Sequence, residues 1–158
     1  VAIYMPGAKH AFDGSYQGKG KNDPVSIDVT VNQYASATDA IDAFDALKKN
    51  IKKCTGSGSN TWTDEDGTKT TYSTELTHGV VPADTTTGVE SLFISNNSLH
   101  ESTPGDSKYL NDNYSVYSLV GDVVIVTEYS SNTNTNLTTK QRKAVNQVAF
   151  NAETRWLN

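Results

Sequence analysis

The segment 113–130 constrains the fold of this chain more than any other, because it predicts a β-hairpin that is apolar on both faces. Gly121 and Asp122 fit a two-residue turn, and pairing outward from that turn sorts the side chains onto two faces. One face receives Ser115, Tyr117, Leu119, Val124, Val126 and Glu128, and the other receives Tyr114, Val116, Ser118, Val120, Val123, Ile125, Thr127 and Tyr129. Such a hairpin is normally central in a sheet. It is covered on both sides, or covered on one side with the other forming a pocket wall.

A helix is predicted before this hairpin, because apolar residues recur at three- and four-residue steps within 37–51. Ser36 or Thr38 can cap its start. Cys54 continues the apolar stripe, which predicts a small buried hydrophobic side chain. Four lysines within 48–53 crowd the end of the helix, where the helix dipole favours cations. The alternative for these lysines is a docking patch for an acidic partner.

A second helix is predicted from about Thr138 to Leu157. Thr138 and Gln141 fit a capping box, in which each side chain satisfies a backbone N–H of the other residue. The expected buried stripe of this helix consists of Val145, Val148, Ala149, Ala152 and Trp156. The long apolar periodicity predicts that the helix packs along a sheet.

Further strands are predicted on both sides of the first helix. Apolar and polar residues alternate over 25–34, which is typical of a strand with one buried face. Asp66 and Gly67 fit a second two-residue turn, which would pair Trp62 with Thr71 in a polar ribbon that projects or lies at a sheet edge.

The segments that follow this ribbon are predicted to form two strands and a loop. Residues 72–78 and 89–95 carry strand patterns, whereas 96–111 is polar, contains Pro104–Gly105 and is predicted to be a long loop.

These elements predict a single domain of the α+β class, an antiparallel β-sheet packed against two long amphipathic helices. The chain of 158 residues is long enough for one core. Residues 25–158 form the expected domain, and 1–24 form a weakly patterned, loop-like N-terminal extension. The start at Val1 suits a mature or trimmed ectodomain.

Charge and composition narrow the classes of partner. The net charge of −5 argues against nucleic acid, whose binders need a basic face to displace counterions. No apolar run approaches the roughly 20 residues of a membrane-spanning helix, so the chain is not expected to span a membrane itself. A surface rich in Ser, Thr and Asn is typical of exported proteins.

The sequence contains no catalytic or metal-binding motif. His10, His78 and His100 are scattered, and neither they nor Cys54 have metal-ligand spacing, so no metal, cofactor or enzymatic activity is predicted. A hydrolase that uses Glu128 or Cys54 beside a second titratable group is the less favoured alternative.

Tyrosines carry the prediction of a binding site. The chain has eight Tyr against four Phe and two Trp, and a phenol can line a pocket while it offers a hydroxyl. The alternative is ordinary packing, with the hydroxyls at the rim of the core. The predicted ligand-binding residues are Tyr117 and Glu128, followed by Tyr114, Tyr129 and Tyr72.

Three stretches carry a resemblance to a known family: VTVNQYASATDAIDAFDAL at 29–47, YSVYSLVGDVVIV at 114–126 and QRKAV at 141–145. Over about 25–157 the chain resembles the extracellular sensor domain of mycobacterial PknH-type serine/threonine kinases and related actinobacterial lipoproteins. The resemblance implies an antiparallel sheet with two helices, a cleft, and ligand sensing at the cell envelope, with no catalytic residues. The sensor domain of these kinases has disulfide-forming cysteine pairs, whereas Cys54 here has no partner cysteine.

The sequence therefore predicts an extracytoplasmic sensor-like domain, anchored to the envelope as a lipoprotein or a membrane-tethered ectodomain. Its expected partner is an unidentified small molecule or envelope component. The alternative function is a surface module for protein–protein interaction, which would use the Trp62 hairpin or a sheet edge.

Overall fold

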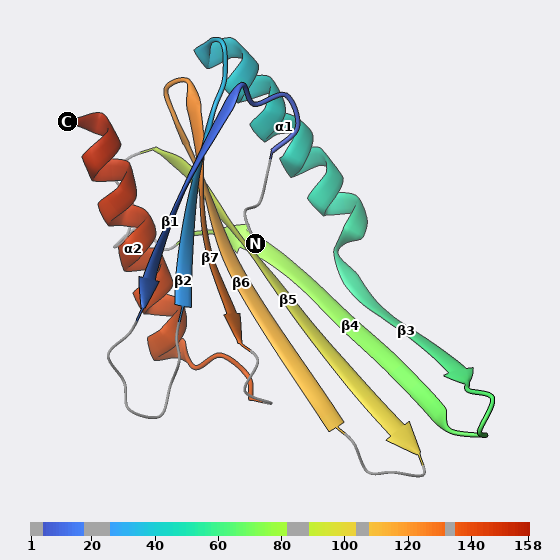
Figure 1. The fold of residues 1–158 in the computed structure, drawn as a ribbon. Coiled ribbons are helices and arrows are strands. Elements are labelled where there is room, and N and C mark those ends of the chain that lie inside the picture. The colour runs from blue at the N-terminus through green and yellow to red at the C-terminus, as the bar shows by residue number, and fades with distance from the viewer. Residues whose placement is uncertain (1–4, 18–25, 82–88, 104–107, 132–134) are drawn as a thin grey trace.

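A single antiparallel sheet forms the centre of the molecule, in the order β1-β2-β7-β6-β5-β4-β3 (Figure 1). The computed structural model describes residues 5–17, 26–81, 89–103, 108–131 and 135–158. Its strands are β1 (His10–Gln17), β2 (Ser26–Gln33), β3 (Gly56–Thr63), β4 (Lys69–Val80), β5 (Glu90–Thr103), β6 (Lys108–Val120) and β7 (Val123–Ser131). The helices are α1 (Ala37–Cys54) and α2 (Thr139–Leu157).

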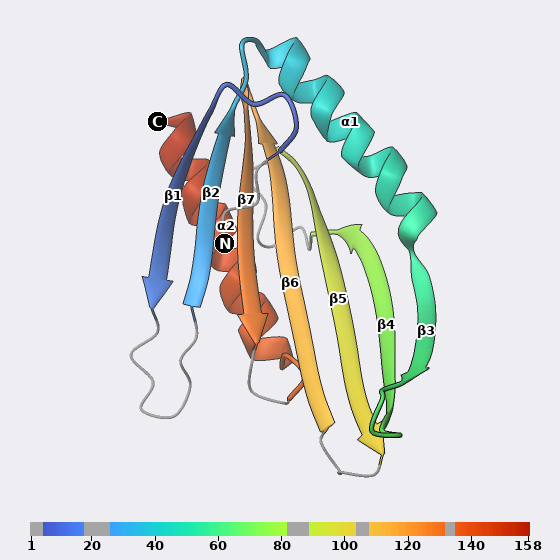
Figure 2. The same ribbon diagram turned by 45° about the vertical axis from the view of Figure 1, so that its right-hand side comes forward.

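The two helices lie on opposite faces of the sheet (Figure 2). On the α1 face, the fully buried Phe44 packs in a cluster with Tyr117 and Val126. On the α2 face, Val145 and Ala149 pack in a cluster with aromatic and aliphatic residues of β2, β6 and β7. The core therefore consists of two thin layers, one on each side of the central strands.

The β6–β7 hairpin confirms the pairing predicted from the sequence. Val120 pairs with Val123 across the turn, and Tyr114 pairs with Tyr129 six residue pairs further along the hairpin. Gly121 has φ of 60°, a left-handed conformation that glycine adopts without steric cost. The two faces contain the predicted residues, and the hairpin is central and covered on both sides.

Both helix starts also match the prediction. The Asp39 N–H donates to Ser36 Oγ at 3.2 Å, and Thr138 and Gln141 form the expected capping box. The end of α1 does not match, because Cys54 is exposed rather than buried. The last turn of α1 extends beyond the central strands, and the chain then turns at Gly56 (φ 136°) into the edge strand β3.

The predicted fold class is wrong in its proportions. The expected α+β domain, with an antiparallel sheet packed against two long amphipathic helices, is instead mostly sheet. The sheet has seven strands, and about twice as many residues lie in strands as in helices. The helices cover its central strands and leave the free ends of β3, β4 and β5 without a helix on either face.

Two segments without an apolar pattern account for much of the extra sheet. Most of 96–111, predicted as a loop, extends β5 to Thr103 and starts β6 at Lys108. Part of the predicted N-terminal extension forms β1, which pairs with β2 at the sheet edge. Backbone hydrogen bonds to a neighbouring strand hold such polar segments, and these bonds leave no periodic signal in the sequence.

The β3–β4 turn is longer than predicted. The Gly67 N–H donates to the Asp64 carbonyl at 2.9 Å, and the Asp64 N–H donates to the Thr68 carbonyl at 2.8 Å. Gly67 has φ of 85°, so the hairpin has a three-residue loop with glycine in the left-handed position. The register shifts by one residue, and Trp62 pairs with Thr70 rather than with Thr71.

Candidate ligand-binding site

A cavity of about 560 Å³ lies between the C-terminal half of α1 and the adjoining ends of β4 and β5. We call it the helix–sheet cavity; it is lined by Lys48, Ile51 and Lys52 of α1 and by residues 78–81 and 89–92. Phe44 anchors the first half of α1 on the central strands. Beyond Phe44 the helix runs toward β3 (Figure 1), and the cavity lies between this part of α1 and the ends of β4 and β5.

The walls of the helix–sheet cavity are mainly apolar and its rim is charged. Val80 is 80% exposed at the rim, which is unusual for a valine in a strand. The Lys48 Nζ lies 2.6 Å from both Asp45 Oδ1 and Glu90 Oε1, and hydrogen bonds to these two carboxylates raise the Lys48 pKa. Lys52 adds a second ammonium group. An apolar chamber with a few polar groups at its mouth is typical of small-molecule sites.

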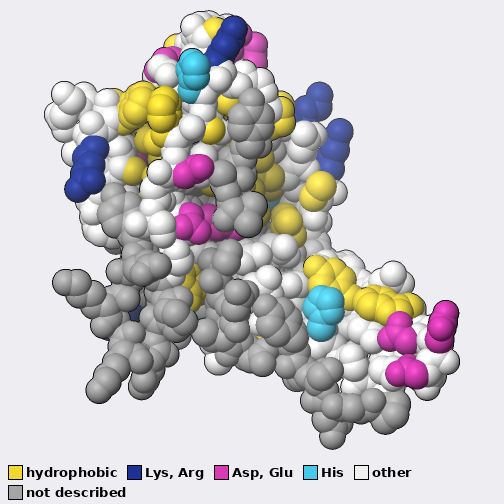
Figure 3. All heavy atoms as spheres, in the orientation of Figure 1, with side chains coloured by type: hydrophobic (Ala, Val, Ile, Leu, Met, Phe, Trp, Pro, Cys, Tyr) yellow, Lys and Arg dark blue, Asp and Glu magenta, His cyan; other side chains and the backbone are white. Residues whose placement is uncertain are grey.

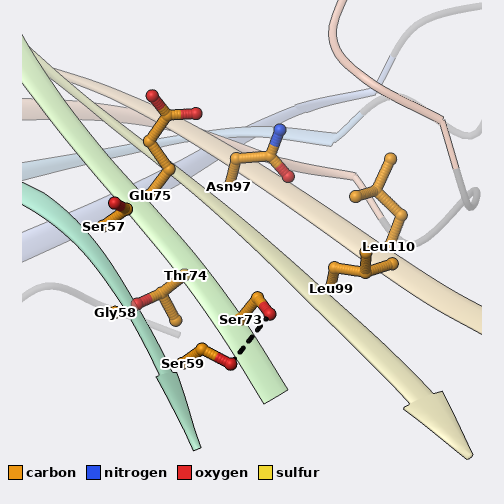
Figure 4. Close-up of a pocket in the computed structure, with 9 residues that line it drawn as sticks. All are labelled: Ser57, Gly58, Ser59, Ser73, Thr74, Glu75, Asn97, Leu99 and Leu110. Carbon is orange, nitrogen blue, oxygen red and sulfur yellow. Dashed lines mark hydrogen bonds between the residues drawn. The ribbon is translucent and has the colours of Figure 1, made fainter. Parts of the chain in front are cut away.

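A second hollow, of about 700 Å³, lies on the α2 face of the outer strands. Figure 4 shows Glu75 and Asn97 rising from its floor beside Leu99 and Leu110, with Ser59 bonded to Ser73. All of its lining residues belong to β3, β4, β5 and β6, so the hollow is walled by a single sheet. It is therefore a shallower polar groove than the helix–sheet cavity, which has walls from two layers.

Tyr117 and Glu128 lie on the same face of neighbouring strands, as predicted, and α1 covers this face. Tyr117 is buried in the Phe44 cluster. Burial, with a smaller contribution from the charge of Glu128, raises the pKa of Tyr117 to about 12. Glu128 is half-buried and pairs with Ser115.

Tyr114 and Tyr129 lie on the opposite face, under α2. The Tyr114 hydroxyl donates to Asn146 Oδ1 at 3.0 Å, and its ring stacks on Phe93 with centroids 5.4 Å apart. Burial raises the pKa of Tyr114. Tyr129 is 1% exposed. Both side chains are parts of the core on this face.

Tyr72 lies far from the other four, on the outer half of β4. Its ring meets the ring of His100 edge-on, with centroids 4.5 Å apart. The structure thus brings Tyr117 together with Glu128 and Tyr114 together with Tyr129, but does not gather the five residues at one place. None of the five lines the helix–sheet cavity or the polar groove.

Sequence reasoning did not find the residues of the helix–sheet cavity. The sequence pattern singles out the lysines near the end of α1, but it places Leu92 in an ordinary strand at 89–95 and Val80 beyond the end of the strand at 72–78. No local pattern shows where a helix separates from a sheet, because this depends on the crossing direction of α1.

Within the described residues there is no group of three or more His, Cys, Asp or Glu side chains that could hold a metal ion. In the same part of the chain, neither helix combines the length and apolar character needed to cross a membrane.

The fold belongs to a class already seen in an extracellular protein domain. The structure is similar to the crystal structure of the extracellular domain of PknH from Mycobacterium tuberculosis, with a TM-score of 0.57 and 14% sequence identity. The similarity covers 94% of this chain and 66% of that chain. The resemblance predicted from the sequence is thereby confirmed at the level of the fold.

Comparisons by sequence add no further relative. No protein-family model matches the chain, and no curated protein sequence matches it.

Proposed function

We propose that this protein is a non-catalytic, extracytoplasmic sensor-like domain that binds a small, mainly apolar ligand in the helix–sheet cavity. The observation that carries the proposal is this cavity itself, which has walls from α1 and from the sheet. Its volume of about 560 Å³ lies within the range of roughly 300–1,000 Å³ that is usual for ligand sites. The fold shared with an extracellular kinase domain supports an envelope location.

The charges at the rim favour a ligand with a polar or anionic group. Lys48 is already paired with Asp45 and Glu90, so Lys52 is the ammonium group best placed to meet such a group. A molecule with an aliphatic chain and a single carboxylate or phosphate fits this arrangement, whether it is free or part of an envelope component.

The five residues proposed from the sequence have different relations to this cavity. Tyr117 pairs with the lining residue Leu92 and supports the cavity wall from the next strand. Glu128 lies further along the same face. Tyr114, Tyr129 and Tyr72 remain proposed ligand contacts that would need a site separate from the helix–sheet cavity.

Binding of decanoate, a ten-carbon chain with one carboxylate, tests the proposal. Decanoate should raise the melting temperature and shift the amide signals of 78–81 and 89–92 in NMR spectra, because a ligand that binds the folded state stabilises it. Lys52→Glu should weaken binding roughly fivefold. The matched control is Lys143→Glu, which makes the same charge change on α2 and should bind as the wild type does.

Two results would count against this proposal. One is the absence of any shift at the cavity residues at millimolar decanoate. The other is equal weakening of binding by Lys52→Glu and Lys143→Glu, which would show an effect of net charge alone.

The second candidate function is a surface interaction module. The observation that favours it is Trp62, which is 42% exposed on the β3–β4 hairpin. Tryptophan is enriched among the residues that contribute most of the binding energy in protein–protein interfaces.

A further inference from the structure

Three aromatic side chains share one exposed area at the free end of the sheet. Trp62 pairs with Thr70, and Tyr72 pairs with Asn60 on one side and with His100 on the other. Because side chains alternate along a strand, this register places Trp62, Tyr72 and His100 on the α1 face. We call these three residues the aromatic strip.

In the aromatic strip, Trp62 is accessible to solvent, and Tyr72 and His100 contact each other. Figure 3 shows hydrophobic side chains gathered beside a histidine over the free ends of the outer strands, next to acidic side chains. Trp62 is 42% exposed, whereas Tyr72 and His100 are half-buried and hold each other edge-on at 4.5 Å. Trp62 and Tyr72 are diagonal neighbours on paired strands, so the two residues are about 7–8 Å apart, within reach of aromatic side chains.

Hydroxyl and amide groups surround the rings. Thr70 Oγ1 lies 3.3 Å from Ser102 Oγ on the same face. Asn60 is exposed beside Tyr72, and Thr74 is the next residue of β4 on the same face. The area therefore offers flat apolar rings interleaved with neutral donors and acceptors.

Acidic side chains adjoin the aromatic strip, and Asp64 Oδ2 accepts a hydrogen bond from Thr70 Oγ1 at 3.5 Å. Asp64, Glu65 and Asp66 are all exposed in the turn that follows β3, and the whole chain has a net charge of −5. Single-stranded nucleic acid also stacks on aromatic side chains, but it needs a positively charged groove along its backbone. Acidic polymers are disfavoured for the same reason.

A protein partner fits the composition of this area less well. The centre of a protein interface is about 65% apolar, whereas here hydroxyls and amides separate the rings. Sugars have the complementary chemistry: a pyranose presents an apolar C–H face to an aromatic ring while its edge hydroxyls bind neutral donors and acceptors.

We propose that the aromatic strip binds a neutral, β-linked oligosaccharide, with successive sugar rings on Trp62 and Tyr72. Hydroxyls of the sugar would bind Asn60, Thr70 and the ring nitrogen of His100. This surface lies at the free end of the sheet and shares no lining residue with the helix–sheet cavity, so it would add a second binding function to the proposed one.

The two tryptophans of the chain provide the assay. In Trp156→Phe, Trp62 is the single fluorescent tryptophan; in Trp62→Phe, only Trp156 on α2 remains. Cellotetraose, chitotetraose and a β-1,4-galactotetraose are titrated into both variants, and maltotetraose, which is α-linked and curved, serves as the control sugar. At least one β-linked probe should change the emission of Trp62 saturably and leave that of Trp156 unchanged.

Ring removal then tests the contacts by saturation-transfer NMR. Tyr72→Ala should weaken binding about tenfold, whereas Tyr72→Phe, which keeps the ring, should stay within about twofold of the wild type. Lys52→Glu should bind the sugar unchanged, which separates this proposal from that of the cavity. The proposal is overturned if no β-linked probe changes the Trp62 emission, or if binding survives Trp62→Ala in a protein with an unchanged melting temperature.

Discussion

The central and outer parts of the sheet are held together in different ways. The covered half, made of β2, β6 and β7, lies between α1 and α2 and contains most of the fully buried side chains. The outer half, made of β3, residues 69–77 of β4 and residues 96–103 of β5, has no helix packed on either face. Every residue of β3 is exposed. The same sheet therefore continues from a packed core into a hydrated surface.

Side-chain hydroxyls show this difference most directly. In the outer half, Thr61 Oγ1 lies 3.0 Å from Thr71 Oγ1 across strands that face solvent. In the covered half, Ser118 Oγ donates to the buried Glu153 Oε1 at 2.5 Å, and Ser91 Oγ donates to the same oxygen. A hydroxyl pair in water can exchange partners with solvent, whereas a buried carboxylate depends on its protein donors. The two halves should therefore respond differently to the same substitution.

The largest contrast is expected between Phe44→Ala and Trp62→Ala. The side chain of Phe44 in α1 is fully buried against the sheet, so its truncation should lower the free energy of unfolding by about 3–5 kcal/mol. Trp62 is exposed in the outer half, and its truncation should change this free energy by no more than about 0.5 kcal/mol. Urea unfolding at pH 7 measures both. Comparable losses would show that the outer half contributes to the same core.

A substitution at Gly79 tests the boundary between the halves. A Cβ at this position would lie 2.8 Å from Cε1 of Phe93, whose ring stacks on Tyr114. Gly79→Ala should therefore displace the Phe93 ring and cost about 1–3 kcal/mol. Gly14→Ala in β1 is the matched control, because its Cβ would meet no atom within 4 Å. Thermal unfolding and the ring-proton shifts of Tyr114 measure the effect.

Serine-to-alanine substitutions compare the hydroxyls themselves. Ser118→Ala removes a donor from the buried Glu153 and should cost about 1–3 kcal/mol. Ser73→Ala removes the exposed contact to Ser59, at 3.4 Å, and should stay within about 0.5 kcal/mol. Chemical denaturation of the two variants measures the difference. If Ser73→Ala were as costly as Ser118→Ala, hydroxyl pairing in the outer half would be structural.

Ionisation of Tyr117 should give a smaller, pH-dependent loss of stability in the covered half. Its pKa in the folded protein is about 12, against about 10 in the unfolded chain, so the folded state keeps the proton longer. The stability associated with the neutral phenol is complete below pH 10 and is lost as pH rises toward 12. At pH 11, the wild type should lose about 1 kcal/mol more than Tyr117→Phe, relative to pH 8.

Paired unfolding curves at pH 8 and pH 11 measure this difference. Equal losses in the wild type and in Tyr117→Phe would mean that the phenol ionises as readily in the folded protein as in the unfolded one.

The two hairpins show how far sequence reasoning reaches. Both have a glycine–aspartate pair at the turn, and the same rule predicted a two-residue loop for each. It was correct at Gly121–Asp122. The hairpin there has apolar side chains on both faces, and because each face is buried under a helix, a shift of register would expose them. It was wrong by one residue at Asp66–Gly67, where the flanks are polar on both faces and no burial distinguishes one register from the next.

This one-residue shift in register decides which side chains share a face in the outer half. In the predicted register, Trp62 and Tyr72 would lie on opposite faces. In the observed one they share a face, which creates the aromatic strip. The helix–sheet cavity was equally outside the reach of the sequence, because it depends on where α1 crosses the sheet.

The sequence by itself determined the elements whose burial leaves a periodic pattern. These are the central hairpin with the residues on each of its faces, the capped starts of both helices, and the likeness of the fold to the extracellular domain of PknH. Only the tertiary structure decided the size of the sheet, the path of α1 and the register of the outer hairpin. Strands held by backbone hydrogen bonds among polar side chains leave no hydrophobic period, so their extent is set by the neighbouring strand.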